Sequence, residues 1–285
     1  MLEQSIPILV FLLMFIVGAS LTFFDIKTLL KRPIVLLIAT LGQVFLLPCL
    51  AWLLIELTQP PPVTAVGLLL VSCCPGGSIS NIYSYFAKVN VTFSVALTAL
   101  NSFFSLILLP LLLSQLFPSL LKIDNDLLVQ TQTLNLLLLL ILPMMLGMGL
   151  SGFNPILMQK VLPIFDRIAA IGLILLLLAI GLEFKDQLIA QFFDLLSLAV
   201  LFTLLALCVA YLFARLLGLS KGERGALLIE FPVRNLALTA LISLSIFDSK
   251  EYILFGAVFF LVQIPIMLFI VYWYRCHNVN NVQLS

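Results

Sequence analysis

Long apolar runs, separated by short polar breaks, fill most of this 285-residue sequence. An α-helix needs about 20 mostly apolar residues to cross the hydrocarbon core of a bilayer. On that scale the runs predict about nine membrane-spanning helices, at residues 5–24, 34–57, 63–87, 91–117, 131–151, 161–182, 189–218, 223–247 and 252–274. The chain is 63% hydrophobic and 9% charged, which is far from the composition of a soluble domain. We therefore expect an all-α, polytopic membrane protein that has the lipid bilayer as its solvent.

The basic residues divide unevenly between the breaks. Alternate breaks face opposite sides of a membrane, and one set holds ten basic residues while the other holds three. The richer set is Lys27, Lys31, Arg32, Lys88, Lys160, Arg167, Arg215, Lys221, Arg224 and Arg275, and the poorer set is Lys122, Lys185 and Lys250. Cytoplasmic loops are enriched in Lys and Arg. We expect a plasma (inner) membrane protein with its N-terminus outside and its C-terminus in the cytoplasm.

A weak internal repeat relates the two halves of the chain. The run 21–25 (LTFFD) at the end of the first span resembles the run 182–186 (LEFKD) at the end of the sixth. The two runs are five spans apart, an odd number, so matching helices must cross the membrane in opposite directions. This is the inverted-repeat plan of many secondary transporters.

The repeat aligns the third and eighth spans, and both are interrupted at their centres. The third contains the run 73–81 (CCPGGSISN), and the eighth contains the run 230–235 (EFPVRN). Proline removes a backbone donor, and glycine accepts non-helical angles. Both helices should therefore break inside the membrane, where the unpaired backbone groups need an ion or a substrate to satisfy them.

Polar side chains gather beside these two breaks. Glu230 is the carboxylate predicted deep in a span, where a charge is costly unless it is paired. It either serves a function or only neutralises Arg234, one helical turn later. Ser94 and Thr98 share one face of the fourth span, although such hydroxyls often bond to carbonyls of their own helix. The candidate ligands, whose oxygens suit a hard monovalent cation, are Ser80, Asn81, Ser94, Thr98 and Glu230.

The run 73–81, followed by Ser94 and Thr98, resembles the bile acid:sodium symporter family, and the likeness continues through the stretch 43–52 and the run 230–235. It covers nearly the whole chain. The resemblance implies a sodium-coupled symporter of a small organic anion, such as a bile acid, a steroid sulfate, pantoate or a 2-oxo acid.

The same resemblance implies that residues 1–285 form one transporter unit, which contains two domains. A core domain, of residues about 34–117 and 189–274, would move against a panel domain, of residues about 5–24 and 131–182, to give alternating access. No nucleic acid and no obligatory protein partner are expected.

By position in the family, Ser80, Asn81, Ser94, Thr98 and Glu230 correspond to a first sodium site. The second site corresponds to Gln43, Glu230, Phe231, Val233 and position 234. Position 234 is usually glutamine in the family, but here it is Arg234. A guanidinium has donors and no acceptor, so it cannot ligate sodium. Arg234 is expected either to replace the second sodium as a tethered cation or to bind the acid group of the substrate.

Substrate contacts are expected from Asn235, Asn101 and Ser78, near the ends of the broken helices. An enzyme is not expected, because the spans hold no HExxH motif and no aspartate pair, and His277 lies in the polar tail. The remaining alternative is a uniporter or a channel in which the ion site is only structural.

Overall fold

The computed structural model describes residues 2–20, 33–77, 79–105, 126–247 and 249–282, and these residues are almost entirely helical. The helices are α1 (Leu2–Ser20), α3 (Pro33–Thr58), α4 (Pro62–Cys73), α5 (Ile79–Phe86), α7 (Asp126–Phe153), α8 (Pro155–Glu183), α9 (Lys185–Leu216), α10 (Lys221–Glu230), α11 (Leu236–Phe247) and α12 (Ile253–Val282). A further apolar helix covers Val91–Ser105. The prediction of an all-α fold is confirmed.

Four helices in the described ranges are long and apolar enough to cross a bilayer: Pro33–Thr58, Pro155–Glu183, Lys185–Leu216 and Ile253–Cys276. Shorter apolar helices cover Ile6–Ile16, Pro62–Cys73, Val91–Ser105 and Ile141–Phe153. The predicted spans 63–87 and 223–247 are each divided into two helices, and neither segment contains a continuous helix of span length.

The outer surface of the second half of α8 is apolar, as a lipid-facing helix requires. Ile171, Ile174, Leu175 and Leu178 are each more than half exposed. A contiguous apolar surface of this kind is unstable in water and is covered by lipid in a membrane protein. Together with the long apolar helices, it identifies the chain as an integral membrane protein.

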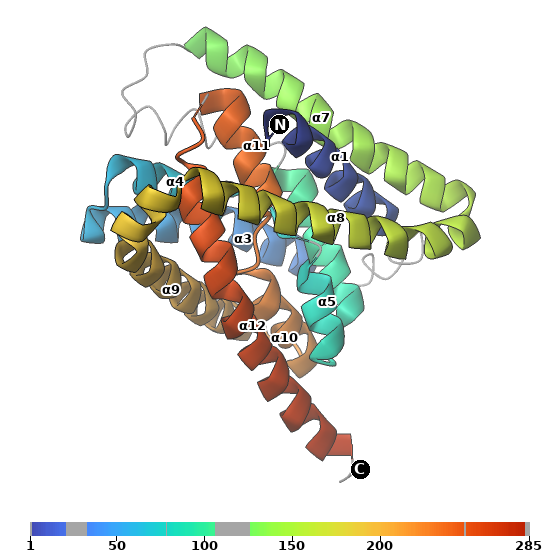
Figure 1. Ribbon diagram of the computed structural model, residues 1–285. Helices are drawn as coiled ribbons and strands as arrows, with labels where there is room; N and C mark the ends of the chain where they lie inside the picture. The colour runs from blue at the N-terminus through green and yellow to red at the C-terminus, as the bar shows by residue number, and fades with distance from the viewer. Residues whose placement is uncertain (1, 21–32, 78, 106–125, 248, 283–285) are drawn as a thin grey trace.

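Helix α1 lies along α7 and also contacts α8, while α12 packs against α9, α4, α11 and α5 (Figure 1). The approach of α1 to α7 depends on two glycines. A Cβ atom at Gly18 would collide with the Met144 carbonyl, and one at Gly147 would collide with the Phe15 carbonyl. Small residues allow this close backbone packing, which substitutes for hydrophobic burial between helices in lipid.

The two interrupted helices cross each other at their breaks. Helix α4 ends at Cys73 and α5 begins at Ile79, while α10 ends at Glu230 and α11 begins at Leu236. In the links, Gly76 and Arg234 form an antiparallel bridge, and the Asn235 amide donates to the Pro75 carbonyl at 3.1 Å. Each link therefore satisfies backbone groups of the other, as backbone without helical hydrogen bonds requires in a membrane.

The predicted crossing of the two broken helices is thus confirmed. The repeat that suggested it cannot be followed in full, because the run 21–25 lies outside the described residues.

Candidate ion and substrate site

A group of buried oxygens surrounds the end of α10, where Glu230 is fully buried. The Thr98 hydroxyl donates to Glu230 Oε1 at 2.8 Å, and the Ser80 hydroxyl lies 3.3 Å from the Thr98 hydroxyl. Asn81 Oδ1 accepts from the hydroxyls of Ser94, at 2.9 Å, and Thr98, at 3.2 Å. All five residues named from the sequence as sodium ligands therefore lie in one connected cluster, which we call the oxygen cluster.

The local structure explains how these residues meet. Ser94 and Thr98 lie one turn apart on the helix Val91–Ser105, so their hydroxyls point the same way. Ser80 and Asn81 lie in the first turn of α5, just after the break, and Glu230 ends α10, immediately before the other break. The crossing thus brings the start of one half-helix to the end of another.

Two features of Glu230 bear on what the cluster binds. Its Oε2 atom is buried and has no hydrogen-bond partner in the described part of the chain. Such a carboxylate oxygen is costly to bury unless a positive charge or a donor satisfies it. In addition, a Cβ atom at Gly76 would collide with Glu230 Oε1, so a larger residue there would displace the carboxylate from its present position beside this link.

Thr98 can adapt its hydrogen bonding to a cation. Its hydroxyl lies within hydrogen-bond distance of Glu230 Oε1, Asn81 Oδ1 and, at 3.1 Å, the Ser94 carbonyl. One hydroxyl has one proton, so it serves one of these acceptors at a time. Donation to the Ser94 carbonyl leaves the hydroxyl lone pairs available to a metal ion, and the cluster therefore fits sodium.

Sequence reasoning missed one member of this environment, Ser84. Its buried hydroxyl donates to the Ser94 hydroxyl at 3.0 Å. The signal was present in the sequence, because Ser84 follows Ser80 by four residues and so lies on the same face of α5.

Arg234 is buried at the crossing, with 3% of its surface exposed. Its Nε and Nη2 atoms donate to the Phe231 carbonyl at 2.9 and 2.6 Å, and Nη1 donates to the Cys74 carbonyl at 3.1 Å. Nη2 also reaches Gln43 Oε1, at 3.5 Å. The guanidinium therefore lies among oxygens of α3 and both links, and two of them belong to residues named for the second ion site. Because α10 ends at Glu230, the helical spacing to Arg234 assumed from the sequence does not apply.

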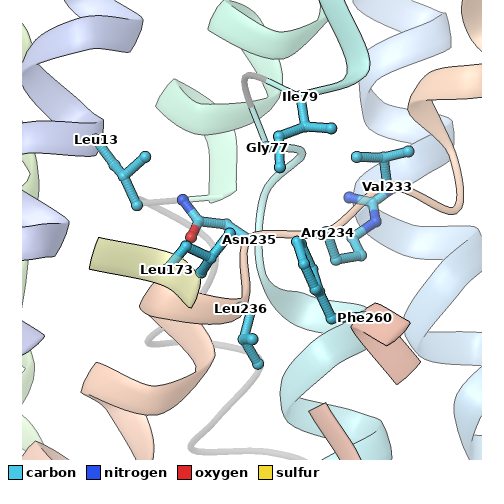
Figure 2. A pocket seen from close by; sticks show the side chains of 9 residues that line it. All are labelled: Leu13, Gly77, Ile79, Leu173, Val233, Arg234, Asn235, Leu236 and Phe260. Carbon is cyan, nitrogen blue, oxygen red and sulfur yellow. The ribbon is translucent and has the colours of Figure 1, made fainter. Parts of the chain in front are cut away.

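A cavity adjoins the crossing. Its lining residues are Leu13, Gly77, Ile79, Leu173, Val233, Arg234, Asn235, Leu236 and Phe260 (Figure 2). The Asn235 amide points toward Leu13 and Leu173, whereas the guanidinium of Arg234 extends to the opposite side of the link. Asn235 Oδ1 accepts from the Leu238 amide at 3.1 Å, which caps the start of α11.

The three residues named for substrate contact have different positions. Asn235 lines the cavity. Asn101 does not belong to the lining, because its side chain is buried against α3 and donates to Gln43 Oε1 at 3.1 Å. Ser78 lies outside the described residues. Val233, named for the second ion site, is buried and lines the cavity.

Two broken helices that cross beside a buried oxygen cluster define the architecture of a class of secondary transporters. A profile of the sodium bile acid symporter family matches residues 7–192. The chain belongs to this family, which confirms the resemblance seen in its motifs.

Similar proteins from a plant, a bacterium and a human have names that describe sodium-coupled or sodium-dependent transporters. The probable sodium/metabolite cotransporter BASS1 of Arabidopsis thaliana chloroplasts is 31% identical over 224 residues, which are 78% of this chain and 54% of that protein. The uncharacterized sodium-dependent transporter YocS of Bacillus subtilis is 25% identical over 247 residues, 87% of this chain and 76% of that protein. The human ileal sodium/bile acid cotransporter is 24% identical over 292 residues, 99% of this chain and 83% of that protein.

The match to the Arabidopsis protein therefore spans about half of that protein's length. The family and these relatives are transporters and not enzymes, in agreement with the prediction for this chain.

Proposed function

We propose that this protein is a sodium-coupled symporter that carries a small organic anion by alternating access. The observation that carries the proposal is the unpartnered Oε2 atom of the buried Glu230, beside hydroxyl and amide oxygens. A hard monovalent cation prefers oxygen ligands of this kind. The names of the relatives, which are sodium/metabolite, sodium-dependent and sodium/bile acid transporters, support the same ion.

Arg234 replaces the second sodium ion in this proposal. Its guanidinium donates to the Phe231 carbonyl and reaches the Gln43 amide oxygen, which are acceptors that a mobile cation would otherwise use. The buried charges then sum to zero with one sodium and one monovalent anion: Glu230 and the anion are negative, and Arg234 and sodium are positive. A neutral loaded site is favourable because an unbalanced charge is costly in a low-dielectric interior.

The substrate occupies the cavity beside Asn235. Most of the lining side chains are apolar, among them Leu13, Ile79, Leu173 and Phe260. The Asn235 side chain, with its oxygen engaged in the cap of α11, has its NH₂ group left to donate to an acid group. The positive end of α11 adds to this attraction. The substrate is therefore an organic acid with an apolar body, of the bile acid, steroid sulfate, pantoate or 2-oxo acid type.

The moving parts are a panel of α1, α7 and α8 and a core of the remaining described helices, which correspond to the two predicted domains. The position of the cavity supports this division, because Leu13 of α1 and Leu173 of α8 face residues of the crossing and of α12 across it. A substrate held between two bodies becomes accessible from alternate sides when one body moves.

The basic residues support an orientation in the plasma membrane with the C-terminal end of α12 in the cytoplasm. We expect a cysteine at position 221 to react with a membrane-impermeant maleimide only after the cells are permeabilised, and one at position 250 to react in intact cells. The unsubstituted chain, whose own cysteines include the exposed Cys49 and Cys208, sets the background. Reaction of both positions from the same side would contradict this orientation.

Uptake into proteoliposomes tests the symport itself. An inward sodium gradient should drive accumulation of an organic acid above its external concentration, and a potassium gradient of the same size should not. A uniporter or a channel with a structural ion would only equilibrate the substrate under both gradients. Equilibration without accumulation, for acids that the protein demonstrably transports, would refute sodium coupling.

A further inference from the structure

A corner between α9 and α10 contains two arginines that share one aromatic ring. The guanidinium carbon of Arg215 lies 5.6 Å from the centre of the Tyr211 ring, and that of Arg224 lies 6.0 Å from it. Each contact is favourable alone, as a cation near the face of an aromatic ring. Together they bring two like charges to one side chain, and a bound anion would offset their mutual repulsion.

No carboxylate in the described ranges forms an ion pair with either arginine. Arg224 donates from Nη2 to the Leu219 carbonyl at 3.3 Å, but its buried Nε has no hydrogen-bond partner there. The adjacent Glu223 accepts from the Ser220 amide at 2.9 Å as part of the cap of α10. The corner therefore offers hydrogen-bond donors and positive charge to which an anion could bind.

The corner lies where the apolar helices end. Tyr211 and Arg215 occupy the last turns of α9, and Tyr274, which packs against Gly225 of α10, lies near the end of the apolar segment Ile253–Cys276. Tyrosine and tryptophan concentrate at membrane–water interfaces, and the neighbouring Trp273 is 44% exposed. The aromatic residues and the helix ends together indicate that the two arginines lie near the depth of lipid head groups.

Apolar surface adjoins the same corner. Leu212 and Leu216, on the last turns of α9, are 60% and 84% exposed. A soluble phosphate would leave these side chains uncovered, whereas the acyl chains of a phospholipid would cover them while its phosphate reaches the arginines.

We propose that this corner binds the phosphate of an anionic phospholipid, held by Arg215 and Arg224 and bordered by Tyr211. The lipid would fix the end of α9 to the start of α10, the half-helix that ends in Glu230. The site is separate from the cavity and from the oxygen cluster, and it stands independently of the transport proposal.

The test measures binding of phosphatidylglycerol to the purified full-length chain in detergent, by native mass spectrometry and by thermal unfolding. We expect phosphatidylglycerol to bind saturably and to raise the unfolding temperature, with no such effect from phosphatidylcholine or inorganic phosphate. Two charge-assisted hydrogen bonds are lost in the double variant Arg215→Gln/Arg224→Gln, so its affinity should fall by at least about 100-fold. As the control, Arg275→Gln removes an exposed charge from the C-terminal part of α12, next to Tyr274. This variant should weaken binding by at most about fivefold.

Unchanged phosphatidylglycerol affinity in the double variant, or an equal loss in Arg275→Gln, would overturn the site. Equal stabilisation by inorganic phosphate would overturn the assignment to a lipid. If the double variant does not fold, Arg215→Gln alone decides the question, because this side chain is exposed and its loss should still cost about tenfold in affinity.

Discussion

Replacing Glu230 by glutamine should abolish sodium-driven accumulation of substrate and remove the stabilisation of the purified protein by sodium relative to potassium. The substitution keeps the shape of the side chain and its hydrogen bond with Thr98, but it removes the negative charge at the buried Oε2 atom. A hydrogen bond or contact to a charged group contributes about 1.5–3 kcal/mol. We therefore expect the sodium affinity to fall by about 10-fold to 100-fold or more, measured by thermal shift against sodium concentration.

Two matched variants separate the charge from general disturbance. Glu56→Gln removes an exposed carboxylate from α3 and should leave the sodium response unchanged. Thr98→Val keeps the shape of its side chain but removes the hydroxyl, and it should weaken sodium by about 2-fold to 10-fold, the contribution of a neutral hydrogen-bonding group. A full sodium response in Glu230→Gln would show that the ion binds elsewhere.

Replacing Arg234 by glutamine should convert transport from one sodium ion per monovalent anion to two. The variant removes the guanidinium from the oxygens of Phe231, Cys74 and Gln43 and supplies an amide oxygen in its place. One net positive charge then moves in each cycle. A membrane potential of 100 mV is worth about 2.3 kcal/mol for one charge, so accumulation at equilibrium should rise by about 50-fold under an inside-negative potential of that size.

The unsubstituted protein should show no such dependence on voltage, because sodium and a monovalent anion move together without net charge. Arg234→Lys is the matched control, since it retains a positive charge and should remain electroneutral. Strong voltage dependence with two sodium ions in the unsubstituted protein would contradict the tethered-cation role.

The rival role for Arg234, direct binding of the acid group of the substrate, predicts a different result for the same variant. Substrate affinity would fall while the sodium stoichiometry stayed at one. The structure favours the tethered cation, because the guanidinium donates to carbonyl oxygens and extends away from the side of the link where Asn235 meets the cavity (Figure 2).

Local sequence pattern was sufficient for the class of fold and for the breaks in it. Apolar runs of span length predict membrane helices because burial in lipid depends mainly on composition. Pro75 with Gly76 and Gly77, and Pro232 in the second link, predict breaks because these residues restrict or free the backbone wherever they occur. The candidate ligands beside the breaks were found for the same reason, since a polar side chain in an apolar span stands out by composition alone.

Contacts between distant segments could not be read from such a pattern. The close approach at Gly76 involves Glu230, and the partners of Arg234 come from Gln43, Cys74 and Phe231. Asn101, equally polar in sequence, contacts Gln43 and does not line the cavity. Spacing along a helix specifies which face a residue occupies, but only the packing of helices specifies what that face meets. For that reason the ends of the broken helices could be located in advance, whereas the acceptors of the buried guanidinium required the folded chain.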